Sequence, residues 1–281
     1  MIIDGRQIAQ GIHCKIKNQL AATPGRKPGL AVILVGDDPA STVYVRNKSN
    51  ACKAVGFYSE TIALPATVTQ AALLAEIARL NQDEQIDGIL VQLPLPEHLN
   101  INQVTDAIHP QKDVDGFHSQ NSGRLMQNRG FLRPCTPKGV MALLTQTGVD
   151  LTTQHCVVVG QSNIVGRPMA IELLNAGATV TICHRKTQNL PAKLQQADII
   201  VVAIGQPKFI KDTWVKRGAI VIDVGINRLQ DGTLCGDVDF DSVQNKVAWI
   251  TPVPGGVGPM TIAMLLENTL MAYQEKQQKT R

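Results

Sequence analysis

Residues 157–168 read VVVGQSNIVGRP, an apolar run followed by a loop with glycines and then by a proline. This order is typical of a strand, a tight turn and a helix that together bind a dinucleotide pyrophosphate. Gly160 permits the tight turn, and Gly166 lets the helix approach the strand closely. The helix N-terminus offers N–H groups to the anion. Because Ser162 replaces the second glycine of the usual pattern, an ordinary strand-to-helix turn is the alternative.

The next predicted strand ends in the run CHRKT at residues 183–187, and this run indicates which dinucleotide is bound. An NAD site usually has an acidic residue here, about 20 residues after the glycines. This chain has two cations and no acid at that point. Because a guanidinium binds a phosphate dianion through paired hydrogen bonds, we expect NADP, with Arg185 on the 2′-phosphate. His184 is expected to be a loop residue near the ribose.

Strand and helix patterns alternate along the chain. The first half has predicted strands at 30–35, 57–64 and 86–91 and predicted helices at 8–20, 40–55 and 69–80. The second half has predicted strands at 155–159, 179–183, 199–203, 219–224 and 247–250. Its predicted helices start at Pro137, with Thr136 as the cap, then cover 165–176, and start again at Pro259. The alternation predicts an α/β fold with two domains, each a mainly parallel sheet with helices on both sides, the second Rossmann-like.

The segment 110–134 is polar and glycine-rich without a clear period, and we place the domain boundary there. Residues 1–120 are expected to form one domain, with a final helix at about 262–281 packing back on it. Residues 121–261 are expected to form the nucleotide-binding domain. Ligands of parallel sheets bind beyond the C-terminal strand ends, where residues 36–41, Gln92 and Gly160 lie. We therefore expect a cleft between the two domains.

Lys48 has an unusual position on the helix predicted at 40–55. At about 100° per residue it lies in the middle of a stripe with Tyr44, Val45 and Cys52, opposite a polar face. Ammonium groups are rarely buried without a partner, so we expect Lys48 to face a cleft, with Tyr44 one turn before it. Snorkelling of the side chain to the helix end is the alternative.

The composition is that of an ordinary globular protein, with 44% hydrophobic and 18% charged residues and a net charge of +4. No run of basic and aromatic residues predicts nucleic-acid binding. The six cysteines are scattered without a CxxC pair, so we expect reduced, mostly packed thiols and no metal. The N-terminus lacks an apolar signal segment, and no apolar run approaches about 20 residues. These features predict a cytoplasmic protein without a membrane partner.

Several segments together resemble the bifunctional methylenetetrahydrofolate dehydrogenase/methenyltetrahydrofolate cyclohydrolase family. They are YVRNK (44–48), GILVQLPLP (88–96), KDVDGF (112–117), PCTP (134–137), the loop at 160–168 and PVPGGVGPMT (252–261). The resemblance covers nearly the whole chain, and QLPLP and PGGVGPMT are its most specific parts. It implies oxidation of 5,10-methylenetetrahydrofolate with NADP⁺, hydrolysis of the 5,10-methenyl product to 10-formyltetrahydrofolate, and usually a homodimer.

The resemblance also implies roles for individual residues. Lys48 is the catalytic lysine, and Gln92 forms a hydrogen bond with it. Tyr44 stacks on the aminobenzoyl ring of the folate, and Asp115 holds the pterin. The remaining implied contacts are Gly160, Gln161, Ser162, Arg185 and Ile226 for NADP, and Leu93, Pro254, Gly255 and Gly256 for the folate.

The chemistry of such a substrate fits a small set of catalytic residues. Removing a hydride from a methylene group between two nitrogens leaves a stabilised cation, so no proton must be abstracted. Water addition to that cation needs a proton acceptor, and burial and the cationic substrate both favour a neutral Lys48 in that role. A charged Lys48 with a purely electrostatic role is the alternative.

The pterin edge presents two donors, which a carboxylate such as Asp115 matches, while Asp113 is the competing candidate and has turn capping as its alternative role. His98, His109 and His118 are expected to be loop or surface residues.

Two other functions stay open. Another two-domain NADP-dependent dehydrogenase, of shikimate or amino-acid type, would share the nucleotide half but has no need of the QLPLP segment. A nonenzymatic NADP-binding regulatory module would not need a desolvated lysine at the edge of a sheet.

Overall fold

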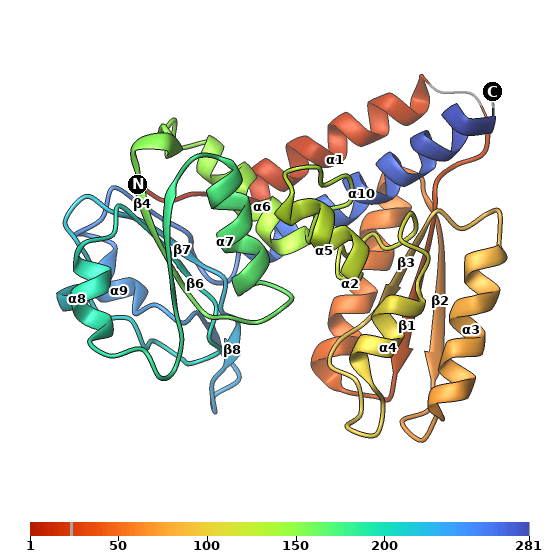
Figure 1. The fold of residues 1–281 in the computed structure, drawn as a ribbon, viewed down its shortest axis with the longest axis horizontal. Coiled ribbons are helices and arrows are strands. Elements are labelled where there is room, and N and C mark those ends of the chain that lie inside the picture. The colour runs from red at the N-terminus through yellow and green to blue at the C-terminus, as the bar shows by residue number, and fades with distance from the viewer. Residues whose placement is uncertain (23–24, 281) are drawn as a thin grey trace. The chain divides into compact units, whose positions relative to one another are not determined.

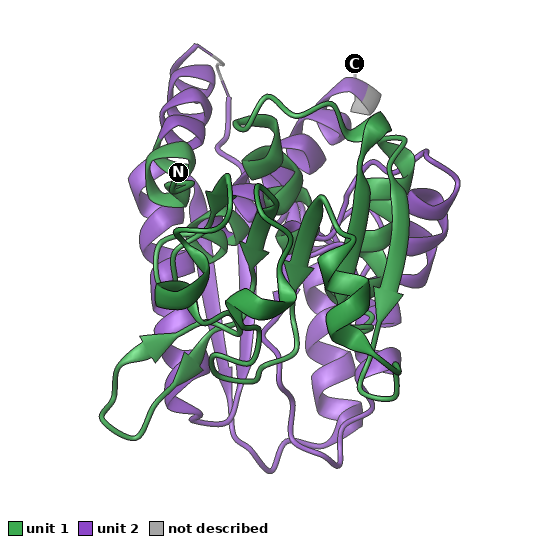
Figure 2. Cartoon of the chain, turned by 90° about the vertical axis from the view of Figure 1, so that its left-hand side faces the viewer, with its two compact units in different colours: residues 1–10, 136–261 green, residues 11–135, 262–281 purple. Residues whose placement is uncertain are grey.

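The computed structural model (Figure 1) describes residues 1–22 and 25–280, so residue 281 of the predicted last helix lies outside the described residues. The chain divides into two compact units (Figure 2). Unit 1 comprises residues 1–10 and 136–261, and unit 2 comprises residues 11–135 and 262–281. All three divisions fall inside helices, namely α1 (Gly5–Ala21), α6 (Cys135–Thr145) and α10 (Val257–Thr280).

Unit 2 contains a three-stranded parallel sheet in the order β2-β1-β3 (Figure 1). Its strands are β1 (Gly29–Val35), β2 (Tyr58–Leu64) and β3 (Gly88–Val91), and the crossovers include α2 (Pro39–Val55) and α3 (Gln70–Gln82). β1 is buried along its whole length because it pairs with a strand on each side. Alternate β1 residues share one core cluster with side chains of α3 and of α4 (Ile101–Ala107).

Unit 1 contains a five-stranded parallel sheet in the order β10-β7-β6-β4-β5. Its strands are β4 (His155–Val159), β5 (Thr179–Cys183), β6 (Ile199–Val202), β7 (Ile220–Asp223) and β10 (Trp249–Ile250). The chain moves from β4 to β5 on one side and then returns to β6 on the other side of β4. This reversal is the topological switch point of a doubly wound sheet, beyond which ligands bind. The Rossmann-like prediction is therefore confirmed.

The structure corrects the sequence prediction mainly at short elements. Helix α5 (Ser119–Met126) lies inside the segment 110–134 that we predicted to be irregular, because its polar sequence SQNSGRLM shows no apolar period. Helix α6 (Cys135–Thr145) begins one residue before the predicted cap Thr136, and α10 begins two residues before Pro259. Also unpredicted were α4, α8 (Leu190–Gln195), α9 (Phe240–Val243), the 3-10 helices η1 (Leu151–Thr153) and η2 (Asp212–Trp214), and the hairpin of β8 (Asn227–Arg228) and β9 (Leu234–Cys235).

Most of the cysteines are packed, as predicted. No disulfide joins any of the six; Cys14 is exposed and the other five are buried. Within residues 1–22 and 25–280, none of the helices combines the length and the apolar character that crossing a membrane requires.

Candidate active site

Helix α2, which carries Lys48, has a capping residue and a proline at its start and a glycine just after its end. The Asp38 carboxylate accepts the Ser41 N–H at 2.7 Å, and Pro39 occupies the first helical position. Gly56 ends the helix in the left-handed conformation, with φ of 89°. The buried side of the helix includes Lys48, whose side chain is only 7% exposed. The snorkelling alternative is therefore wrong for this side chain.

Gln92 is the hydrogen-bond partner of Lys48. Lys48 Nζ donates to Gln92 Oε1 at 2.9 Å. Gln92 follows β3 directly, and its side-chain Nε2 donates to the Leu93 carbonyl at 2.7 Å. This second bond turns Oε1 toward Lys48, so the amine acts as donor in this pair. Two segments 44 residues apart thus meet at the C-terminal edge of the sheet.

Asp115 and Tyr44 lie near this pair. Burial raises the pKa of the Asp115 carboxyl, while the Lys48 ammonium and a hydrogen bond with the Cys135 thiol lower it. Lys48 therefore lies within electrostatic reach of Asp115. Tyr44 lies one turn before Lys48 on α2 and is half-buried, and this burial raises the pKa of its phenol. Unit 2 thus brings the four predicted catalytic residues to one region.

Asp113 has a different environment from Asp115. Its buried carboxylate accepts the N–H groups of Phe117 at 3.2 Å and His118 at 2.9 Å, and the Asn121 amide at 2.8 Å. These three donors belong to the turn and to the start of α5. Asp113 therefore stabilises the local backbone, which fits its alternative role, and the role of Asp115 toward a ligand stays a prediction.

Asn268 on α10 is a residue of this region that the sequence analysis missed. Its buried amide donates to the Val114 carbonyl and to the Arg133 carbonyl, both at 2.8 Å. It thus joins the peptide next to Asp115 to a second backbone segment. The sequence could have indicated it, because Asn268 is a single asparagine inside the largely apolar stretch MLLENTLMAY.

The glycine turn of unit 1 fits a phosphate-binding loop. Gly160 follows β4 at the switch point, has φ of +131°, and donates its N–H to the Cys183 carbonyl at 2.9 Å. A Cβ at Gly160 would lie 2.4 Å from the Ala203 carbonyl oxygen, and one at Gly166 would lie 2.2 Å from the Gly160 carbonyl oxygen. Both positions therefore require glycine for close backbone approach.

The other predicted cofactor residues are exposed. Gln161 and Ser162 are exposed, and the Ser162 hydroxyl accepts the N–H groups of Val165 at 3.2 Å and Gly166 at 3.3 Å. Arg185 is exposed on the loop after β5. Ile226, after β7, is 43% exposed.

The predicted folate contacts fall in both units. Leu93 is half-buried next to Gln92 in unit 2. Pro254 is exposed and Gly255 and Gly256 are buried in unit 1, where Arg6 N–H donates to the Gly255 carbonyl at 3.2 Å. Their place beside a folate stays a prediction, as does the cleft.

His98, His109 and His118 each form a hydrogen bond with a backbone group. His98 Nε2 bonds the Val68 carbonyl at 2.9 Å, while Nδ1 of His109 and Nδ1 of His118 each accept an N–H group from the second residue after them. Among the described residues, no group of three or more His, Cys, Asp or Glu side chains could hold a metal ion.

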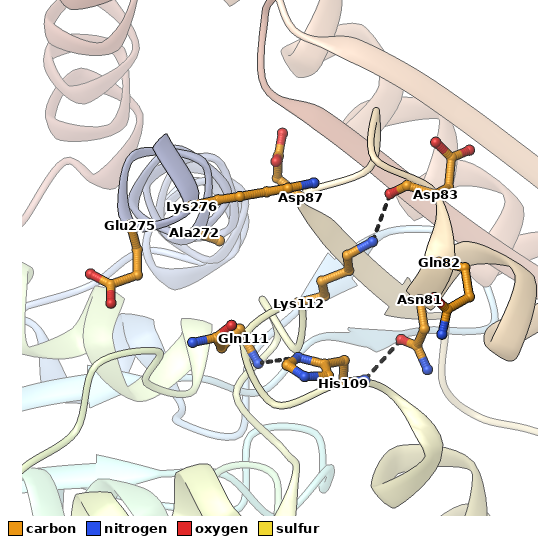
Figure 3. A pocket seen from close by; sticks show the side chains of 10 residues that line it. All are labelled: Asn81, Gln82, Asp83, Asp87, His109, Gln111, Lys112, Ala272, Glu275 and Lys276. Atoms are coloured by element: carbon orange, nitrogen blue, oxygen red, sulfur yellow. Dashed lines mark hydrogen bonds between the residues drawn. The ribbon is translucent and has the colours of Figure 1, made fainter. Parts of the chain in front are cut away.

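A separate pocket of about 250 Å³ lies at the opposite edge of the unit 2 sheet (Figure 3). Asp87, which lines it, precedes β3, whereas Gln92 follows β3. Lys112 points to the Asp83 carbonyl there, donating to it at 2.7 Å and to the Leu80 carbonyl at 2.8 Å, and burial lowers the pKa of Lys112 to about 8. Because ligands of parallel sheets bind at the C-terminal edge, this pocket is not the candidate active site.

Comparison with known proteins shows the family of this chain. Residues 3–115 match the family model of the tetrahydrofolate dehydrogenase/cyclohydrolase catalytic domain, and residues 134–277 match the model of its NAD(P)-binding domain. The "Bifunctional protein FolD" of Ruthia magnifica is 66% identical over 275 residues, which is 98% of this chain and 99% of that protein.

Solved structures show the same similarity. A bifunctional methylenetetrahydrofolate dehydrogenase/cyclohydrolase from Campylobacter jejuni is 50% identical, with a TM-score of 0.95 over 98% of this chain and 99% of that one. A homologous enzyme from Trypanosoma brucei, complexed with NADP and an inhibitor, is 40% identical, with a TM-score of 0.95 over 98% of each chain. Shikimate dehydrogenase from Thermus thermophilus is 14% identical with a TM-score of 0.51, a likeness of fold alone.

Proposed function

Because this chain belongs to the tetrahydrofolate dehydrogenase/cyclohydrolase family, we propose that it oxidises 5,10-methylenetetrahydrofolate with NADP⁺ and hydrolyses the 5,10-methenyl product to 10-formyltetrahydrofolate. The observation that carries this proposal is the half-buried hydrogen bond from Lys48 to Gln92 beside Asp115. It supports the proposal because it holds an amine within electrostatic reach of a carboxylate.

Unit 1 supplies the cofactor site. The close backbone approach at Gly160 and Gly166 fits a pyrophosphate, and Gln161 and Ser162 are exposed beside it. Arg185 would hold the 2′-phosphate, and Ile226 would contact the nicotinamide. When bound, NADP⁺ accepts a hydride from the methylene carbon. The chain's own residues need only orient the two reactants for this step.

Unit 2 supplies the folate site and the proton acceptor for water addition. Gln92 Oε1 occupies one N–H of Lys48, and a neutral amine keeps its lone pair for the proton of the attacking water. Asp115 would accept the two donors of the pterin edge, and Tyr44 would stack on the aminobenzoyl ring. Leu93, Pro254, Gly255 and Gly256 would line the remaining folate surface.

The domain bounds stay those predicted from the sequence, with residues 1–120 and the final helix as the folate domain and residues 121–261 as the NADP domain. The compact units differ from these bounds in placing residues 1–10 in unit 1 and residues 121–135 in unit 2. The family resemblance supports a homodimer. Scattered cysteines that form no disulfide support a cytoplasmic location.

A purified chain provides the decisive assay. It should reduce NADP⁺ when 5,10-methylenetetrahydrofolate is added, and methenyl absorbance should then fall as water adds. A parallel assay with NAD⁺ tests the role of Arg185, and a parallel assay with shikimate tests the alternative dehydrogenase. NADP⁺ reduction with shikimate and not with the folate would contradict the proposal.

A further inference from the structure

Two buried carboxylates lie at the C-terminal edge of the unit 1 sheet. Asp223 ends β7 and is 3% exposed, and Asp237 follows β9 and is 0% exposed. Within the described part of the chain, neither carboxylate forms an ion pair. Buried charges are usually paired with an opposite charge, so these two require an explanation.

Asp237 joins two loops through four donors. Its Oδ2 accepts the N–H groups of Ile204 at 2.7 Å and Gly205 at 3.0 Å. Its Oδ1 accepts the N–H of Gln206 at 2.9 Å and the Asn227 side-chain amide at 2.8 Å. These four donors leave neither oxygen without a hydrogen-bond partner. The Asp237 carboxylate therefore holds the loops after β6 and β7 together.

Asp223 supports this arrangement. Its oxygens accept the N–H groups of Gly225 at 3.0 Å, Asp237 at 3.0 Å and Val238 at 2.8 Å. A Cβ at Gly225 would lie 2.2 Å from the Asp237 side chain, and one at Gly236 would lie 1.9 Å from the Asp223 side chain. Burial and, to a lesser extent, the like charge of Asp237 raise the pKa of Asp223. The loops are thus packed directly against the two carboxylates.

These loops lie where a cofactor would bind. The loop after β6 starts at Ala203, whose carbonyl oxygen lies 2.4 Å from the Cβ position of Gly160. The loop after β7 presents exposed Ile226 between Gly225 and Asn227, which both bond to the buried pair. The Asp237 carboxylate therefore lies beside the loop of the residue that we assign to the nicotinamide.

We propose that Asp237 supplies a fixed negative charge that favours the oxidised, cationic nicotinamide ring over the reduced, neutral one. This inference rests on the proposed function. Hydride transfer moves a hydrogen nucleus and two electrons from the methylene carbon to the ring, so the positive charge passes from the nicotinamide to the folate. A carboxylate near the ring stabilises the first state more than the second. It thereby favours NADP⁺ binding and NADPH release.

Binding of the two cofactor forms to the full-length chain tests this inference. Dissociation constants for NADP⁺ and NADPH are measured by calorimetry at pH 8 for the wild type and Asp237→Asn. The wild type should bind NADP⁺ more tightly, and the variant should lose about tenfold of that preference, as a charge within about 10 Å at an effective dielectric of about 20 implies. Equal weakening of both forms would show a purely structural role and overturn the proposal.

Asp198→Asn is the matched control. Asp198 also accepts a backbone N–H, from His155 at 2.9 Å, but it lies at the opposite edge of the same sheet, so its removal should leave the preference unchanged. If Asp237→Asn does not fold, Asp223→Asn at pH 8 should show a smaller loss in the same direction, and an unchanged ratio there would overturn the proposal. A wild type that prefers NADPH would also overturn it. A wild type that binds neither form would instead contradict the NADP site.

Discussion

Lys48 and Gln92 form a hydrogen bond of 2.9 Å between the buried side of α2 and the end of β3, and the orientation of the Gln92 amide makes the lysine the donor. A lysine held in this way keeps its position in either protonation state. An ammonium would still have two further N–H groups, and a neutral amine would have one N–H group and a lone pair. The pair is therefore compatible with a group that takes up and releases a proton during turnover.

Lys48→Met should reduce water addition to the methenyl substrate by about 100-fold or more, because it removes the proton acceptor and keeps an apolar stem of similar length. The fall of methenyl absorbance measures this rate. Lys53→Met, an exposed change on the same helix, is the matched control and should leave the rate unchanged. Near-normal water addition by Lys48→Met would remove this residue from the mechanism.

Asp115→Ala should raise the KM for the folate at least about tenfold, since a hydrogen bond to a charged group contributes about 1.5–3 kcal/mol. Steady-state kinetics measure this effect, and calorimetry should find NADP⁺ binding unchanged. Asp113→Ala is the comparison, and it should instead lower the free energy of unfolding by about 1–3 kcal/mol, because it leaves buried N–H groups without an acceptor. Equal losses of folate and NADP⁺ binding in Asp115→Ala would indicate a structural role.

The sequence predicted those features that have a period or a fixed spacing. Lys48 stood out because an apolar stripe repeats every three to four residues around it, and Gly160 because a strand precedes it and a helix follows. Both sheets and their parallel topology followed from the same alternation. Helices α5, α8 and α9 were missed because they are too short or too polar to repeat an apolar pattern.

The residues that hold the sites in place could not be predicted in this way. Asp237 bonds to residues about 30 positions earlier, and Asn268 bonds to residues more than 130 positions earlier. Their partners are mainly backbone N–H and C=O groups, which every sequence contains. Only the folded backbone shows that a particular Asp or Asn is buried among them.

Arg26→Met should lower the free energy of unfolding by about 3 kcal/mol, because it leaves a buried carboxylate without its cation. Arg26 donates to both oxygens of Asp87, at 2.7 Å and 2.6 Å, and the Asp87 side chain is 0% exposed. Urea unfolding measures the change. Arg79→Met removes an exposed guanidinium from surface ion pairs and should cost only about 0–1 kcal/mol. Similar losses in the two variants would contradict this interpretation of the Arg26–Asp87 pair.

The pKa of Asp223, raised by burial to about 7, gives the unfolding free energy a pH dependence of known sign. Between the unfolded pKa of about 4 and pH 7 the folded chain holds a proton that the unfolded chain has lost. The contribution of Asp223 to the free energy of unfolding is therefore fully present below the unfolded pKa and is lost as the pH rises through 7. From pH 5 to pH 8 the free energy of unfolding of the wild type should fall by about 3 kcal/mol more than that of Asp223→Asn, because the asparagine cannot titrate.

Urea unfolding of both proteins at the two pH values measures this difference, and the comparison cancels the contributions of other groups that titrate in the window, such as His13, whose pKa burial lowers. Asp198→Asn is the control. The Lys216 ammonium lowers the pKa of Asp198, so its contribution is present above the unfolded pKa and is lost only in stronger acid. The free energy of unfolding of Asp198→Asn should therefore change between pH 5 and pH 8 by the same amount as that of the wild type. An identical dependence in Asp223→Asn would mean that Asp223 is ionised throughout this range.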